Sequence, residues 1–184
     1  MHGLTATSGR TSAAALLCGL SLLAAGCSGG REYTLPKDLC GVPVSEVSEK
    51  SISPLLPEGK KLVMQGDPLV DMSGMCFVAV DSRKGVVVGA EKTDRFYDPM
   101  GELVEYKFTN RKKMDPLPFD GAGAMGDTNF VISTPCGTPD VPHLTVSVSV
   151  GDRAEEDVDR RRADMEAFAL AFVPSVKKEL ACTA

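Results

Sequence analysis

The feature that most constrains the fold is a series of strand-like segments that ends in one long amphipathic helix. In His143–Val150, apolar residues alternate with hydroxyl-bearing ones, so one side of the segment is apolar and the other polar. The apolar residues that follow recur at three- and four-residue spacing: Met165, Phe168, Ala169, Phe172, Val173 and Val176. This order predicts an α+β fold, a two-layer sandwich in which the C-terminal helix packs on one face of an antiparallel sheet.

Four further segments have the composition of strands. Together with His143–Val150, the expected strands are Lys61–Gln65, Met75–Asp81, Gly85–Ala90 and Asn129–Thr134. The second and third form a hairpin across Ser82–Lys84. Leu103–Phe108 also alternates, although a short helix that begins after Asp98 and Pro99 fits it equally. We therefore expect a sheet of about five to six strands.

The remaining segments are less regular. Val44–Leu56 is at best weakly helical, because Pro54 and Pro57 break it. Asn110–Asp127 is rich in Gly, Pro and basic residues and predicts an exposed loop. Asp152 is the expected N-cap of the C-terminal helix, with Glu155 as its capping-box partner. Pro174 predicts a kink or a fresh turn before Cys182.

The N-terminus has the pattern of a signal peptide. Ala13–Gly26 is apolar but shorter than the roughly 20 residues that span a bilayer, and it has the length of a signal-peptide core. The run ends in Leu22-Leu23-Ala24-Ala25-Gly26-Cys27, which resembles the lipobox of bacterial lipoproteins, with Ala24 where Leu or Val is commoner. The resemblance implies a signal peptide over residues 1–26 and a diacylglycerol on Cys27. Residues 27–32 are then a tether, and residues 33–184 form a single globular domain.

The cysteine count agrees with acylation. Of the six cysteines, Cys18 leaves with the signal peptide, and an odd set of five remains in an exported chain. Acylation of Cys27 leaves an even set of four. Outside the cytoplasm these four are expected to form two disulfides, for which three connectivities are possible. We favour Cys40–Cys76, which joins the N-terminal segment to the first hairpin, and Cys136–Cys182, which joins the end of the helix to a strand.

Motifs for a cofactor or a metal are weak. Gly121–Gly126 matches the dinucleotide fingerprint but precedes a predicted strand rather than a helix, so we interpret it as a flexible loop. Met72, Met75 and Cys76 could bind copper(I), although core packing and a disulfide explain them better. Asp94, Asp98, Glu102 and Glu105 lack the spacing of a calcium loop. We predict no cofactor and no metal.

Catalytic and charged motifs are also sparse. His143 is the only histidine after the signal peptide, no nucleophile motif accompanies it, and we interpret it as structural or exposed. Arg160–Arg162 lies at helical spacing from Glu156 and Asp157, which favours a solvated helix face over a phosphate site. Arg31 is interpreted as a solvated linker residue rather than a contact to lipid headgroups. The net charge of −5 argues against nucleic-acid binding.

The positions of the cysteines suggest a broader likeness. Cys40 near the start, the strand Cys76–Asp81, Pro135-Cys136 and the late Cys182 resemble small actinobacterial lipoproteins of unknown function. The resemblance implies a compact α+β domain anchored through Cys27 at the outer face of the cytoplasmic membrane. We expect a non-enzymatic binding or accessory module for an envelope protein or a cell-wall ligand. The alternative is a hydrolase that acts on envelope material.

Overall fold

A computed structural model describes residues 30–44, 46–71, 73–138, 141–151 and 156–183. Its strands are β1 (Asp38–Leu39), β2 (Val42–Pro43), β3 (Leu62–Gly66), β4 (Ser73–Val80), β5 (Arg83–Thr93), β6 (Lys112–Met114), β7 (Ala122–Met125), β8 (Asn129–Pro135) and β9 (His143–Val150). Its helices are α1 (Glu46–Ile52), α2 (Val158–Glu179) and two 3₁₀ segments, η1 (Ser53–Leu55) and η2 (Glu102–Lys107).

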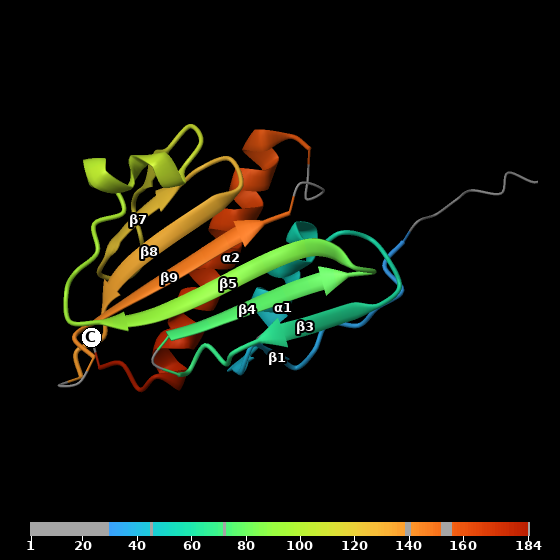
Figure 1. The fold of residues 1–184 in the computed structure, drawn as a ribbon, viewed down its shortest axis with the longest axis horizontal. Coiled ribbons are helices and arrows are strands. Elements are labelled where there is room, and N and C mark those ends of the chain that lie inside the picture. Colours follow the sequence, from blue (N-terminus) through green and yellow to red (C-terminus); the bar gives the residue numbers. More distant parts are fainter. Residues whose placement is uncertain (1–29, 45, 72, 139–140, 152–155, 184) are drawn as a thin grey trace, which may run out of the picture.

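Among these described residues, seven strands form one antiparallel sheet in the order β3-β4-β5-β9-β8-β7-β6. The α2 helix lies behind the sheet, with α1 beside it (Figure 1). The opposite face carries no helix over β3, β4 and β5 (Figure 1). The α+β class and the packing of the C-terminal helix on an antiparallel sheet are therefore confirmed.

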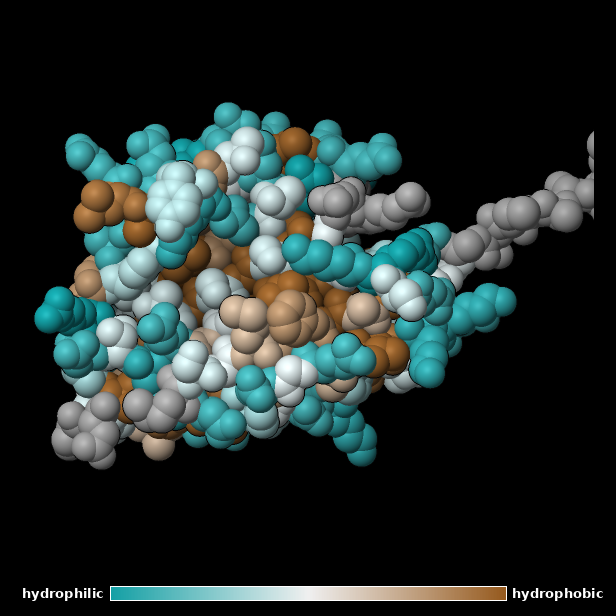
Figure 2. All heavy atoms as spheres, in the orientation of Figure 1, coloured by the Kyte–Doolittle hydropathy of each residue, from teal (hydrophilic) through white to brown (hydrophobic). Residues whose placement is uncertain are grey.

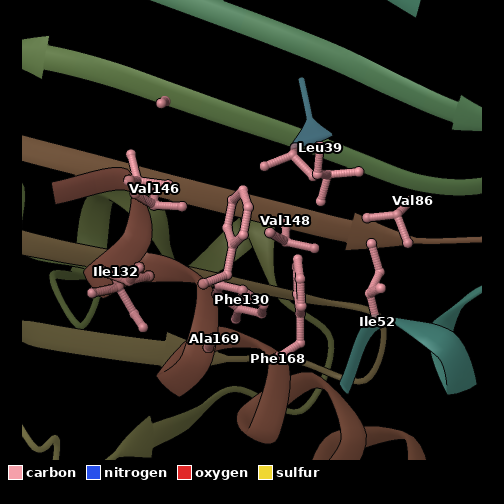
Figure 3. Packing of buried hydrophobic residues seen from close by; sticks show 14 of the residues in the cluster. Leu39, Ile52, Val86, Phe130, Ile132, Val146, Val148, Phe168 and Ala169 are labelled. Atoms are coloured by element: carbon pink, nitrogen blue, oxygen red, sulfur yellow. The ribbon is translucent and has the colours of Figure 1, made fainter. Parts of the chain in front are cut away.

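The core lies between the sheet and its helical layer. Val146 and Val148 of β9 and Phe130 of β8 face Phe168 and Ala169 of α2 (Figure 3). All five are at most 2% exposed. Burial stabilises each large apolar side chain in this layer by roughly 1.5–3 kcal/mol.

The structure departs from the expected elements at two places. Leu103–Phe108 lies mostly in the 3₁₀ segment η2 and not in a strand. The expected loop at 110–127 contains β6 and β7, which bring the sheet to seven strands. The sequence of β7, Ala-Gly-Ala-Met, lacks β-branched residues and a polar alternation, so its strand signal is absent even though three of its four residues are buried.

The α2 helix begins later than expected and continues through its proline. Its N-cap is Asp157, whose carboxylate accepts a hydrogen bond from the Arg160 backbone N–H at 2.9 Å. Asp152 and Glu155, the expected cap and partner, lie outside the described residues. The helix remains continuous past Pro174 as far as Glu179. Of the two expected outcomes, the fresh turn is wrong and the kink stays a prediction.

Candidate functional site

The face of the sheet opposite α2 is the most distinctive surface of the molecule, and we call it the open face. The register places these side chains on it: Met75, Phe77 and Ala79 of β4; Val87, Gly89 and Glu91 of β5; His143, Thr145, Ser147 and Ser149 of β9; Val131 and Ser133 of β8. Figure 2 shows an apolar hollow at its centre with a mostly polar rim. Among the described outward positions of β8 and β9, none carries a formal charge.

An apolar ridge borders this hollow. Met75 and Phe77 are 51% and 48% exposed, although both lie in the middle of a long strand. Between them Cys76 points to the covered face, where it is bonded to Cys40. The disulfide therefore fixes the strand that presents the two exposed side chains.

A groove of about 340 Å³ runs along the ridge towards the edge strand β3. Apolar and polar residues both line it: Val63, Gln65, Phe77, Ala79 and Ser82. The register pairs Val63 with Ala79 and Gln65 with Phe77, so the groove follows two neighbouring strands. Exposed apolar side chains beside a groove are typical of a binding surface.

Small residues form the floor on the other side of the ridge. Gly89 lies between Met75 and Ser147 in the register. A Cβ atom built on Gly89 would lie 2.8 Å from the Ser147 hydroxyl and otherwise close only to backbone oxygens at 3.9 Å or more. With glycine at this position, no side chain projects into the hollow from the middle of β5.

The segment 94–108 forms the opposite wall and covers the β7–β8 part of the open face. Phe108 is buried against Ala124 and Val131, and the side chains of Tyr97 and Met100 pack on the same cluster. The Arg111 guanidinium holds the segment in place by donating to the Gly101 carbonyl oxygen at 2.8 Å.

Four polar groups are buried at this wall without a hydrogen-bond partner, and we call them the hydroxyl cluster. They are the Tyr97 hydroxyl, Ser133 Oγ, His143 Nδ1 and Thr145 Oγ1. Ser133 and Thr145 are directly opposite each other on β8 and β9, and His143 is the next outward residue on β9. Ser133 is fully buried and Thr145 is 9% exposed. Each unpaired buried polar group costs about 1–3 kcal/mol, so four together at one place require an explanation.

The β4–β5 turn closes the other end of the open face. The Asp81 carboxylate accepts hydrogen bonds from the backbone N–H groups of Lys60 and Lys61, both at 2.9 Å. These two bonds lower the pKa of Asp81 below its ordinary value. The turn is thereby attached to the start of β3.

Both favoured disulfides are present. Cys40–Cys76 and Cys136–Cys182 have Cα–Cα distances of 5.8 and 4.4 Å. Two disulfides indicate an oxidising, extracytoplasmic location. Cys27, the predicted acylation site, lies outside the described residues.

The metal and dinucleotide patterns do not assemble into sites. Gly121–Gly126 spans β7, which leads into β8 and not into a helix, so the fingerprint lacks its required context and the predicted loop is wrong here. Met75 and Cys76 point to opposite faces of β4, and Met72 lies outside the described residues. No group of three or more potential metal ligands occurs in the described part of the chain, which includes Asp94, Asp98, Glu102 and Glu105.

Two predictions about arginines are wrong. Arg161 is 8% exposed and donates to the Asp127 carbonyl oxygen at 2.6 Å, and Arg162 forms an ion pair with the Asp127 carboxylate at 2.5 Å. These side chains attach the start of α2 to the sheet rather than forming a solvated face. Arg31 donates to the Ser53 hydroxyl and to the Leu56 carbonyl oxygen, so it belongs to the folded domain and not to a free linker.

His143 lies at the start of β9, where its ring contacts Phe96 edge-on at a centroid distance of 5.6 Å. Its Nδ1 has no partner, so the carboxylate that orients a catalytic histidine is absent at this atom. His143 is the one member of the hydroxyl cluster that its residue type marks in the sequence; Tyr97, Ser133 and Thr145 were not predicted. The only available signal was the uncharged polar side of His143–Val150.

The chain matches no protein-family model, no curated protein and no solved structure. Within the described residues, no helix combines the length and apolar character needed to cross a bilayer. The open face therefore has to be interpreted from its own chemistry.

Proposed function

We propose that this chain is a lipid-anchored, extracytoplasmic binding module that holds its partner or ligand on the open face. The half-exposed ridge of Met75 and Phe77 carries the proposal, because two large apolar side chains in the middle of a strand are left in water. The solvent-exposed face of a sheet usually carries polar side chains at such positions. An exposed apolar ridge is therefore a reason to infer contact with another molecule.

The surroundings of the ridge support binding rather than a packing defect. The strand that carries it is joined to the N-terminal segment by Cys40–Cys76, and the covered side of that strand is fully packed. A surface that is ordered before binding loses little conformational entropy on association. The lipobox-like sequence up to Cys27 and the two disulfides support attachment outside the cytoplasm.

Photo-crosslinking in intact cells tests the binding surface. A photoreactive phenylalanine analogue at position 77 is expected to capture a specific envelope component. The same analogue at position 167, an exposed position on α2, is the matched control and is expected not to capture it. Equal capture from both positions, or none from position 77, would overturn the binding role of the open face.

Mass spectrometry of the purified protein tests the anchor separately. We expect an N-terminal peptide that begins at Cys27 and carries acyl chains. A peptide with an unmodified Cys27 thiol, or with the leader still attached, would refute the anchor while leaving the crosslinking result valid.

A further inference from the structure

The hydroxyl cluster has no role in the fold that the described contacts explain. Its four atoms are the only buried side-chain polar atoms without partners in the described residues. Three of them belong to neighbouring outward positions of β8 and β9, and Tyr97, which follows β5, packs on the cluster that contains Val131. Buried polar groups in folded proteins are nearly always hydrogen-bonded to protein or to a bound molecule. These atoms are therefore candidates for hydrogen bonds to a bound molecule.

The neighbour of Ser133 shows how the same strand treats a structural hydroxyl. Thr134 is also fully buried but points to the covered face. Its hydroxyl donates to the Asp120 carbonyl oxygen at 2.6 Å and accepts from Lys177 Nζ at 3.3 Å. Of these two adjacent residues, Thr134 has hydrogen-bond partners within the fold, whereas Ser133 has none.

The chemistry of the cluster favours an uncharged ligand. The three hydroxyls can each donate or accept a hydrogen bond and carry no formal charge, and His143 Nδ1 adds a ring nitrogen beside them. The cluster atoms themselves supply no acidic or basic counter-charge for a charged ligand, which is costly to bury unpaired. The nearest charged groups lie beside the cluster: Glu91 is opposite Thr145 in the register, and Lys107 Nζ is 5.2 Å from the Tyr97 ring centroid. A ligand with several hydroxyl groups of its own matches four such atoms.

An aromatic side chain lies at the edge of the same place. Phe96 is 45% exposed, and its ring contacts the His143 ring. An exposed aromatic surface beside convergent polar groups is the combination that binds a ring with an apolar face and polar edges. Ser133 and Thr145 are buried, so a ligand reaches their hydroxyls only if part of the chain that covers them moves aside.

We propose that the hydroxyl cluster is a binding site for a neutral sugar residue, with Ser133, Thr145, His143 and Tyr97 as hydrogen-bonding partners and Phe96 as the stacking surface. This inference rests on the proposed function and specifies the ligand class of the open face. An extracytoplasmic binding module would meet such residues in cell-wall glycans and as free sugars.

The test uses the full protein purified in a detergent without a sugar headgroup. The probes are the methyl glycosides of glucose, galactose, arabinose and N-acetylglucosamine, with glucuronate and glucosamine as charged counterparts. Binding is measured by saturation-transfer NMR. We expect at least one neutral glycoside to bind and both charged sugars to fail. Sedimentation with purified cell walls then distinguishes a wall glycan from a free sugar.

Thr145→Val and Ser133→Ala remove the hydroxyls with little change of shape. Since these hydroxyls have no partner in the fold, the melting temperature is expected to stay the same or rise, while sugar affinity falls roughly tenfold for each lost hydrogen bond. Thr134→Val is the matched control. It is expected to lower the melting temperature, because its hydroxyl is used by the fold, and to leave affinity unchanged.

Three results would overturn the site: no binding of any neutral glycoside by the unaltered protein, binding of the charged sugars alone, or equal affinity in Thr145→Val and the unaltered protein. Cluster atoms completed by water alone would give the first result. Failure here leaves crosslinking at position 77 and acylation of Cys27 unaffected, so the proposed function can survive it. Conversely, if the protein binds a sugar but mass spectrometry shows no acyl chain on Cys27, the lipid anchor is refuted and the sugar site is not.

Discussion

The two faces of the β4, β5 and β9 strands show how one sheet can serve two purposes. On β9, Leu144, Val146 and Val148 point to the covered face and are fully packed, whereas Thr145, Ser147 and Ser149 point to the open face. A one-sided sheet in water commonly carries charges on its exposed side, but this one carries small hydroxyls and an apolar ridge. Strand alternation thus separates a stabilising surface from one available to another molecule.

Truncating an aromatic residue on each face should give the largest difference. Phe168→Ala on the covered side removes a fully buried ring and is expected to cost about 3–5 kcal/mol of unfolding free energy. Phe77→Ala on the open face is expected to cost about 1 kcal/mol or less, since half of its side chain is already in water. Urea unfolding measures both. Similar costs for the two substitutions would mean that the open face is part of the core.

Removing the disulfide beneath the ridge should couple the two faces. The double substitution of Cys40 and Cys76 by Ser is expected to cost about 2–5 kcal/mol and to lower crosslinking from position 77. The corresponding change at Cys136 and Cys182 is the control. It is expected to cost a similar amount, measured by urea unfolding, with crosslinking retained wherever the protein stays folded. A loss of crosslinking in both variants would show that the ridge depends on global stability only.

Adding one methyl group to a glycine on each face should give effects of opposite sign. Gly89→Ala on the open face is expected to raise stability by about 0.4–1 kcal/mol, because the Ser147 hydroxyl can rotate away. Gly123→Ala on the covered face meets Met114 Cβ at 3.0 Å and Ile132 Cγ1 at 3.3 Å, and is expected to destabilise. Thermal unfolding measures both. The comparison fails if Gly89→Ala is the more harmful change.

The smallest effect is expected at the β4–β5 turn, where Asp81 lies. Because the folded-state pKa of Asp81 is lowered, its contribution to stability is present above the ordinary value of about 3.9 and is lost as the pH falls through the folded-state pKa. Asp81→Asn should therefore lose slightly less stability than the unaltered protein on acidification from pH 5. Identical acid-unfolding curves would contradict the role of its two backbone hydrogen bonds.

The elements that could be predicted from the sequence are those whose pattern is local. The alternation in His143–Val150 and the helical spacing from Met165 to Val176 each describe one element that buries one side, so both were predicted correctly. The strand β7 was not predicted, because its residues are mainly Ala and Gly, which have no strand preference. Small residues are needed there because neighbours such as Met114 pack closely against Gly123. Tertiary contacts, and not local preference, form that strand.

Most of the candidate site could not be predicted from the sequence, because it also depends on tertiary contacts. Tyr97 and Thr145 are far apart in sequence and come to the same part of the sheet only through the order β5-β9-β8. Whether a hydroxyl has a partner depends on that topology, as the contrast between Ser133 and Thr134 shows. Arg161 and Arg162 were misinterpreted because helical spacing to acids also fits side chains that reach across to Asp127.

The attachment of Arg31 has a geometric consequence. Glu32 N–H donates to the Gly59 carbonyl oxygen, so the described chain starts beside the β4–β5 turn, at the opposite end of the strands from the C-terminus (Figure 1). Three residues lie between Cys27 and Arg31, so the two Cα atoms are at most about 14 Å apart. If Cys27 is acylated as proposed, the β4–β5 end of the strands is held within that distance of the lipid, and the end of the strands near the C-terminus lies farther from it.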